Sequence, residues 1–170
     1  MLKLLSNLLN RVCGVNKKVV SILLLTRRQL LVKYYRLIGI KPNKNLLTIL
    51  DETALDIFCY SLIDYLFISH FCVYEKIFSE MQNYVPRITS INNIYCLIEN
   101  NTKDLMQLYD NYLQKPINEN NYTSFQRSLS KTGELLESRF TLEDQLIKLV
   151  LNKYFSCHHK VNYKSKTISP

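Results

Sequence analysis

The sequence predicts an all-α protein, an antiparallel four-helix bundle with an additional N-terminal helix. Its 170 residues include only three glycines and four prolines, so long stretches run without a residue that breaks helices. Apolar residues recur at helical spacing, and the alternation typical of strands is nowhere sustained. The length and the 47% hydrophobic content suit one compact domain.

The predicted helices are separated by short segments rich in Pro, Asn and Gly. In order they cover about residues 2–12, 17–38, 51–82, 89–114 and 121–155. Asp51 is a plausible N-cap for the third helix. The fourth has a possible break at residues 99–102, and the last a possible bend at Gly133 or restart at Thr141. We expect a single helical domain over residues 1–155 and a basic, disordered tail over 156–170.

The cysteine pattern argues against disulfides and metal sites. The five cysteines are an odd number, widely spaced and without a C-x-x-C pair, which favours a reducing cytoplasm. The run "CHHK" at residues 157–160 has no second ligand cluster, so we expect no metal and no cofactor. We see no signal peptide or membrane span near the N-terminus. Signatures of nucleotide, metal and nucleophile sites are absent, which argues against an enzyme and a small-molecule substrate.

Charge is distributed unevenly along the chain. Residues 1–50 carry ten Lys or Arg and no acid, whereas residues 51–80 carry six acids and one base. A basic N-terminal third is compatible with nucleic-acid binding through residues 1–50. Solvated faces of ordinary helices are the simpler interpretation, so we expect nucleic acid not to be the main partner.

The third predicted helix carries acids within an aromatic run, "SLIDYLFISHFCVYEKIF" at residues 61–78. At about 100° per residue, its core stripe is centred on Leu55, Cys59, Leu62, Leu66, Val73 and Ile77. On this wheel Asp64 and Glu75 point away from the core, within about 20° of each other. His70 falls at the core margin and is read as a hydrogen-bonded core-edge residue.

Large aromatic residues share the outward face of Asp64. They are Tyr60, Phe67, Phe71 and Phe78, together with Ile68. This combination is typical of a protein-interaction surface that selects a basic partner. The alternative is that a further helix covers the face. Both can hold if one end is covered.

Several blocks resemble, in order, the regulator of sigma D family (Rsd/AlgQ). They include "LLVKYYRLIGIKPNK", "ALDIFCYSLIDYLFISHFCVYEKIF", "LIENNTKDLMQLYDNYL", "NYTSFQRSLSKTGELLESRF" and "LEDQLIKLVL", within residues 2–151. The resemblance implies a cytoplasmic, all-helical anti-sigma factor. Such a protein binds region four of the primary sigma factor, blocks its contacts with promoter DNA and core RNA polymerase, and favours alternative sigma factors in stationary phase.

The resemblance also indicates a sigma-binding site. The family's sigma-contacting aspartate matches Asp64 in "SLIDYL". From the wheel alone we add its neighbours as further candidates, namely Tyr60, Tyr65, Phe67, Phe71 and Glu75.

Overall fold

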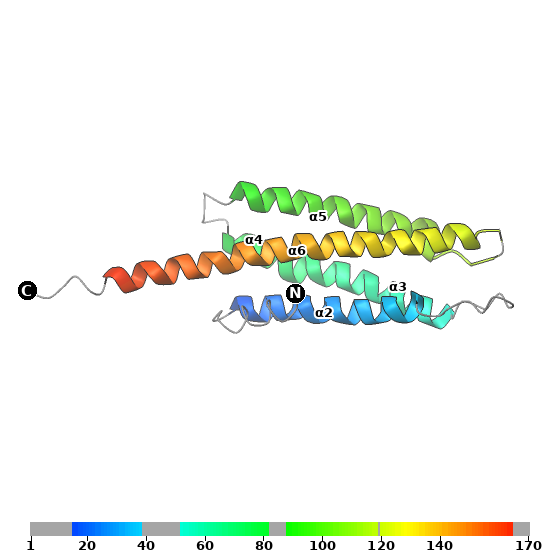
Figure 1. Cartoon of the computed structure of the whole chain (residues 1–170), viewed down its shortest axis with the longest axis horizontal. Helices are drawn as coiled ribbons and strands as arrows, with labels where there is room; N and C mark the ends of the chain where they lie inside the picture. Colours follow the sequence, from blue (N-terminus) through cyan, green and yellow to red (C-terminus); the bar gives the residue numbers. More distant parts are fainter. Residues whose placement is uncertain (1–14, 39–51, 82–87, 119, 165–170) are drawn as a thin grey trace, which may run out of the picture.

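The computed structural model describes residues 15–38, 52–81, 88–118 and 120–164, and side chains within 18–38, 52–79, 89–118 and 120–149. These parts form four helical rods that run side by side, successive rods in opposite directions (Figure 1). No strand occurs in the described residues, which confirms the all-helical class. The helix predicted at 2–12 lies outside them, so the bundle with an additional N-terminal helix stays a prediction.

The first rod is α2 (Val15–Ile38). Its buried residues include Val20, Leu23, Leu30 and Leu37, which recur every three or seven positions and therefore line one side of the helix. Arg27 lies on this same buried side. The core stripe of α2 thus contains a charge.

The second rod was predicted as one continuous helix, but it changes helix type. It consists of α3 (Glu52–Phe67), the π-helical segment η1 (Ile68–Tyr74) and α4 (Glu75–Met81). The Glu75 N–H donates to the carbonyl of His70, five residues earlier. The predicted core stripe is nevertheless buried throughout, from Leu55 to Ile77.

The π turn changes which side chains share a face. Each of its hydrogen-bonded rings takes in one more residue than in an α-helix, so residues beyond it are rotated relative to an ideal wheel. Tyr65 and Tyr74 are nine positions apart and would lie about half a turn from each other on a straight α-helix. Both are instead buried and donate to the same carboxylate oxygen.

The third rod joins α5 (Ile88–Leu108) to a second π segment, η3 (Tyr109–Leu113). The predicted break at residues 99–102 does not occur. Asn101 is buried and donates to the carbonyl of Leu135, and Thr102 accepts from Arg139, so these polar residues serve interior hydrogen bonds within a continuous helix.

The fourth rod, α6 (Tyr122–Lys164), is continuous. The predicted restart at Thr141 is wrong, because its hydroxyl donates back to the Glu137 carbonyl within the helix. Gly133 marks a close approach instead of a bend: a Cβ there would collide with the Tyr34 hydroxyl oxygen. The helix does not end at the predicted boundary at residue 155. The division into a domain of residues 1–155 and a tail of 156–170 stays a prediction.

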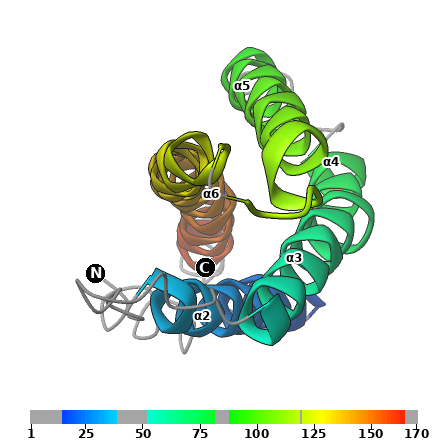
Figure 2. The same ribbon diagram turned by 90° about the vertical axis from the view of Figure 1, so that its right-hand side faces the viewer.

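Seen end on, α2, α3, α4 and α5 form an arc that partly surrounds α6 (Figure 2). Backbones approach most closely within two pairs, α2 with α3 and α5 with α6. Long side chains fill the space between the pairs, among them Tyr65, Tyr74 and Arg139, which are fully buried.

One stretch of the described residues, Glu52–Ser79, is long and apolar enough to span a bilayer, and 44% of its most apolar window is buried inside the protein. Core helices of soluble proteins share this composition, so the stretch is weak support for a membrane span.

Candidate protein-interaction face

The second rod presents an exposed row of aromatic side chains around one acid, which we call the acidic aromatic face. It comprises Tyr60, Asp64, Phe67 and Phe71, spaced by four, three and four residues, so the side chains follow one another along the helix. Tyr60 is 72% exposed, Phe67 59% and Phe71 50%. The rings of Phe67 and Phe71 lie 4.7 Å apart and form one apolar surface beside the Asp64 carboxylate.

The wheel misplaced Tyr65, because it treated the rod as an ideal α-helix with a single narrow core stripe. Tyr65 is 1% exposed and donates its hydroxyl proton to Glu143 Oε1. It therefore supports the rod from inside and does not belong to the acidic aromatic face.

Glu75 is exposed, but it lies beyond the π turn and is rotated away from Asp64. Burial raises the pKa of Tyr95, and the charges of Glu99 and Glu75 raise it further. Glu75 is therefore near Tyr95 of α5, toward the covered side of the rod.

That end of the predicted outward face is covered by α5. The Phe78 ring packs edge-on against Tyr95 at 4.5 Å, and His70 lies 6.0 Å from the same ring. His70 also contacts Phe71. It sits at the core margin as predicted, and among the residues that the structure describes it is held by ring contacts and not by a side-chain hydrogen bond. The two interpretations of the face therefore hold at opposite ends: exposed around Asp64, covered around Phe78.

Beneath the face, a buried polar cluster joins the rods through Glu143, which is fully buried. Glu143 Oε1 accepts from the hydroxyls of Tyr65 and Tyr74, the latter at 2.5 Å. Its Oε2 lies 2.9 Å from Arg27 Nη2, while Arg27 Nη1 lies 2.7 Å from Asp144 Oδ1. Burial raises the pKa of both tyrosines well above the usual value, and the Glu143 charge adds to this.

Arg139 extends the cluster to α5. Its Nη1 donates to Thr102 Oγ1 at 2.8 Å, and its guanidinium lies over the rings of Tyr65 and Tyr74, 5.4 and 5.6 Å from their centroids. Its Nε lies 3.4 Å from Glu143 Oε1 but does not reach hydrogen-bond geometry, so this contact is electrostatic only. Side chains from all four rods thus meet in one neutral cluster of two arginines and two acids.

Sequence reasoning missed this cluster, although a signal was present. Glu143 lies on the apolar stripe of α6, between Leu136 and Ile147, as Arg27 lies on that of α2. A charge on the core stripe of one helix and an opposite charge on the stripe of another predict a buried ion pair. The count of basic residues 1–50 had assigned Arg27 to the surface.

Comparison with known proteins identifies the family. The model for the regulator of RNA polymerase sigma(70) subunit, Rsd/AlgQ, matches residues 1–151. The chain belongs to this family. It is 46% identical over 162 residues to the regulator of sigma D of Enterobacter sp. (strain 638), which covers 95% of this chain and 97% of that relative. The regulator of sigma D of Pectobacterium carotovorum subsp. carotovorum (strain PC1) is 45% identical over 138 residues, 81% of this chain and 90% of the relative.

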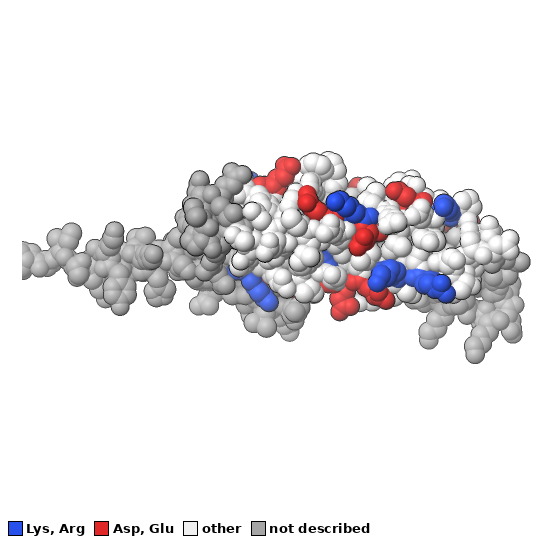
Figure 3. Space-filling view, turned by 90° about the horizontal axis from the view of Figure 1, so that it is seen from above, with Lys and Arg blue, Asp and Glu red and all other residues white. Residues whose placement is uncertain are grey.

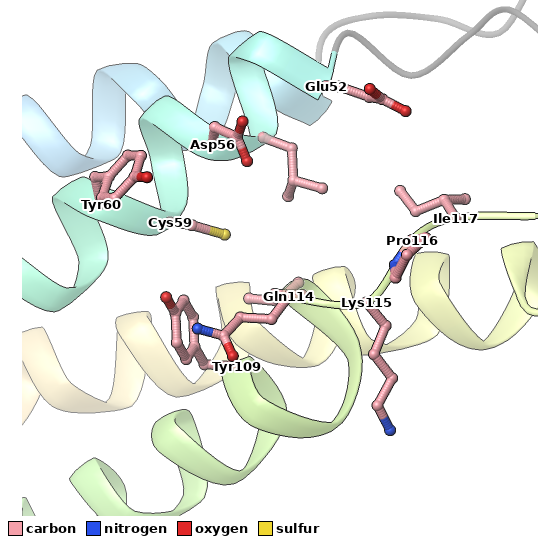
Figure 4. Close-up of a pocket in the computed structure, with 11 residues that line it drawn as sticks. Glu52, Asp56, Cys59, Tyr60, Tyr109, Gln114, Lys115, Pro116 and Ile117 are labelled. Atoms are coloured by element: carbon pink, nitrogen blue, oxygen red, sulfur yellow. The ribbon is translucent and has the colours of Figure 1, made fainter.

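Next to the acidic aromatic face, the Rsd/AlgQ-family chain has an open pocket of about 460 Å³ between α3 and the end of the third rod. Glu52, Asp56, Cys59 and Tyr60 line it from α3, and Tyr109 faces them from η3 (Figure 4). Burial raises the pKa of the Cys59 thiol to about 11, with the Asp56 charge adding to this, so the thiol is a poor nucleophile. Besides this thiol, the pocket is lined by two carboxylates, two aromatic rings and the Lys115 side chain.

Other chemistry finds little support in the part of this Rsd/AlgQ-family chain that the structure describes. No group of three or more His, Cys, Asp or Glu residues there could hold a metal ion. The side chains of residues 157–160 lie outside that part. On the side that carries α5, acidic and basic side chains are interspersed (Figure 3). That side therefore shows no continuous basic patch for nucleic acid.

Proposed function

We propose that the chain is an anti-sigma factor that binds region four of the primary sigma factor through the acidic aromatic face. Occupying region four blocks its contacts with promoter DNA and core RNA polymerase, and so favours alternative sigma factors in stationary phase. The observation that carries the proposal is the exposed row of Tyr60, Phe67 and Phe71 around a single carboxylate, in a chain of the Rsd/AlgQ family.

The chemistry of the face suits a DNA-reading module. A helix-turn-helix surface that binds phosphates is rich in Arg and Lys, so it is complementary to Asp64. The aromatic rings on either side of Asp64 would exclude water from such a charge pair, which strengthens it. Clusters of this kind carry most of the binding energy in protein interfaces.

The pocket beside Tyr60 extends the complementary surface. Glu52 and Asp56 lie along its α3 wall, and the rings of Tyr60 and Tyr109 flank it (Figure 4). An Arg side chain from the sigma factor would find two carboxylates and aromatic surfaces there, a combination that guanidinium groups prefer. Asp64 and this pocket would then hold two separate basic side chains.

Titration of region four into wild type and Asp64→Ala by calorimetry tests the proposal. Truncation of Asp64 should weaken binding by about 2 to 5 kcal/mol, because it leaves a basic partner side chain unpaired. The free energy of unfolding should change by less than about 0.5 kcal/mol, since Asp64 is exposed. Raising the salt concentration should weaken the wild type more than the variant.

Asp104→Ala is the matched control. It removes an exposed carboxylate of α5 and should leave the affinity for region four unchanged. Equal affinities of wild type and Asp64→Ala would remove the acidic aromatic face from the interface. Salt-dependent binding of the chain to random duplex DNA that survives Asp64→Ala would favour the nucleic-acid alternative. The proposed role also places the chain in the cytoplasm, as a single helical domain over residues 1–155.

A further inference from the structure

A second exposed stripe runs along α2. It consists of Leu25, Arg28, Val32 and Tyr35, spaced by three, four and three residues. Each of its three uncharged members is more than half exposed, and the Arg28 side chain is exposed as well. We call this the basic stripe. Its large apolar side chains are unusual on the outer side of a helix that already has a buried face.

The basic stripe matches α3 residue by residue. Ile57, Tyr60, Asp64 and Phe67 have the same spacing of three, four and three, and all four are exposed. Each stripe has one charged residue among three apolar residues, and the two charges have opposite signs. When the two stripes are laid antiparallel, residues of the same kind face each other. The facing pairs are Leu25 with Phe67, Arg28 with Asp64, Val32 with Tyr60, and Tyr35 with Ile57.

The two stripes lie on one side of the molecule. α2 and α3 pack side by side in the arc around α6 (Figure 2), and each helix has its buried residues along one side. Each stripe is roughly opposite those buried residues on its own helix. Together they form a two-helix surface with a basic row and an acidic row.

The register within one chain allows this surface to bind a copy of itself. Tyr34 of α2 and Phe58 of α3 lie at the same height along the two helices, with ring centroids 5.6 Å apart. In two antiparallel helices, residue pairs whose numbers have the same sum lie at matching heights. Each facing pair above has the same sum as Tyr34 and Phe58. Rotation about a two-fold axis parallel to the helices leaves the height of every residue along that axis unchanged, and it places α2 over α3 of the second copy. Residues that lie at the same height on α2 and α3 of one chain therefore face each other across the interface between the two copies. All four pairs form in the same arrangement.

Charge selects this arrangement over the other symmetric one. Between residues 18 and 38 α2 has four bases besides the buried Arg27 and no acid, and between residues 52 and 67 α3 has three acids and no base. A two-fold axis perpendicular to the helices would stack α2 on α2 and α3 on α3, bringing like charges together. The parallel axis instead places the bases of α2 over the acids of α3.

We infer that the outer face of α2 and α3 binds a second copy of this chain, with α2 of each copy antiparallel to α3 of the other and Arg28 paired with Asp64. The interface is isologous and closed, so it gives a dimer and no larger assembly. Because Asp64 would be buried in it, the dimer and the sigma complex exclude each other; this last step rests on the proposed function.

Sedimentation velocity over a range of protein concentrations tests the inference without any sigma factor. The wild type should form a dimer as concentration rises, and Arg28→Glu and Asp64→Arg should each weaken the dimer about tenfold or more, because each places like charges opposite each other. The double variant Arg28→Glu with Asp64→Arg should regain the dimer. Its reversed charges still face each other when α2 lies over α3 of the second copy.

Arg127→Glu is the control for the charge change, since Arg127 is exposed on α6, away from this face. It should dimerise like the wild type. A wild type that stays monomeric up to its solubility limit would overturn the inference, and so would a dimer that Arg28→Glu leaves intact or that the double variant fails to restore. Binding of region four measured on Arg28→Glu separates the two proposals: unchanged or tighter binding retains the sigma site even if no dimer forms.

Discussion

Glu143→Gln isolates the charge at the centre of the buried cluster. Glutamine keeps the side-chain length and one carbonyl oxygen, so Tyr65 and Tyr74 retain an acceptor. The substitution leaves Arg27 and Arg139 with Asp144 as the remaining acid of the cluster, and Asp144 contacts only Arg27. Arg139 is fully buried, so its charge would have no close counter-charge among the described residues.

The cost follows from that unpaired charge. Removing one partner of a buried ion pair typically destabilises a protein by about 3 to 5 kcal/mol. For a chain of this size, each kcal/mol lowers the melting temperature by about 2 to 4 °C, so a fall of roughly 6 to 20 °C is expected. Glu143→Ala should cost more, since two buried tyrosine hydroxyls then lose their acceptor at about 1 to 3 kcal/mol each.

Urea unfolding followed by far-UV circular dichroism gives the free energies directly. Asp64→Asn is the matched control, because it neutralises an exposed carboxylate and should change stability by less than about 0.5 kcal/mol. If Glu143→Gln lies within about 1 kcal/mol of the wild type, the reasoning fails, and the cluster does not depend on its charge balance.

Three further predictions concern other parts of the structure. Because the pKa values of Tyr65 and Tyr74 are raised in the folded protein, both tyrosines are protonated in the folded and in the unfolded chain below about pH 10. Above that pH the unfolded chain loses these protons first, so the free energy of unfolding should fall by up to about 1.4 kcal/mol per pH unit for each tyrosine. Urea titrations from about pH 9 to 11 should show a shallower fall in the variant with Phe at both positions. Gly133→Ala should destabilise the protein by about 1 to 3 kcal/mol in thermal melts, because the new methyl group meets a buried tyrosine hydroxyl of α2, and an unchanged melting temperature would contradict that close contact. Iodoacetamide should label Cys72, which is exposed, well before Cys59, which is buried with a pKa of about 11, and peptide mass spectrometry showing equal rates would refute the packing described for α3.

The sequence allowed part of this architecture to be predicted because helical periodicity reports burial directly. The stripe from Leu55 to Ile77 is buried as expected, and Asp64 is exposed. The prediction for Tyr65 failed because the buried side of α3 is wider than the predicted stripe and also takes in Ala54 and Phe58. The π turn that follows was missed as well, since no residue type announces it. Tyr65 and Tyr74 are expected on the same side of the rod only when the extra residue in the π turn is counted.

The buried cluster was hidden for a different reason. Arg27 and Glu143 are separated by 116 residues, so the apolar stripe of neither helix shows which charge on another helix is its partner. Asn101 and Thr102 looked like helix breakers for the same reason, because their partners lie on another rod. Local propensity describes each segment alone, whereas the placement of polar groups in a core is decided by the fold as a whole.

The cluster also determines how the molecule can open. Arg27 comes from α2, Thr102 from α5 and Glu143 from α6, so separating α2 from α6 breaks a buried ion pair, and separating α5 takes the hydrogen-bond acceptor Thr102 away from Arg139. Partial openings that detach one helical pair are therefore nearly as costly as complete unfolding. In native-state hydrogen exchange, the slowest amides of α2 and α6 should exchange through the same global event, which makes this chain a single cooperative unit in spite of its two closely packed helical pairs.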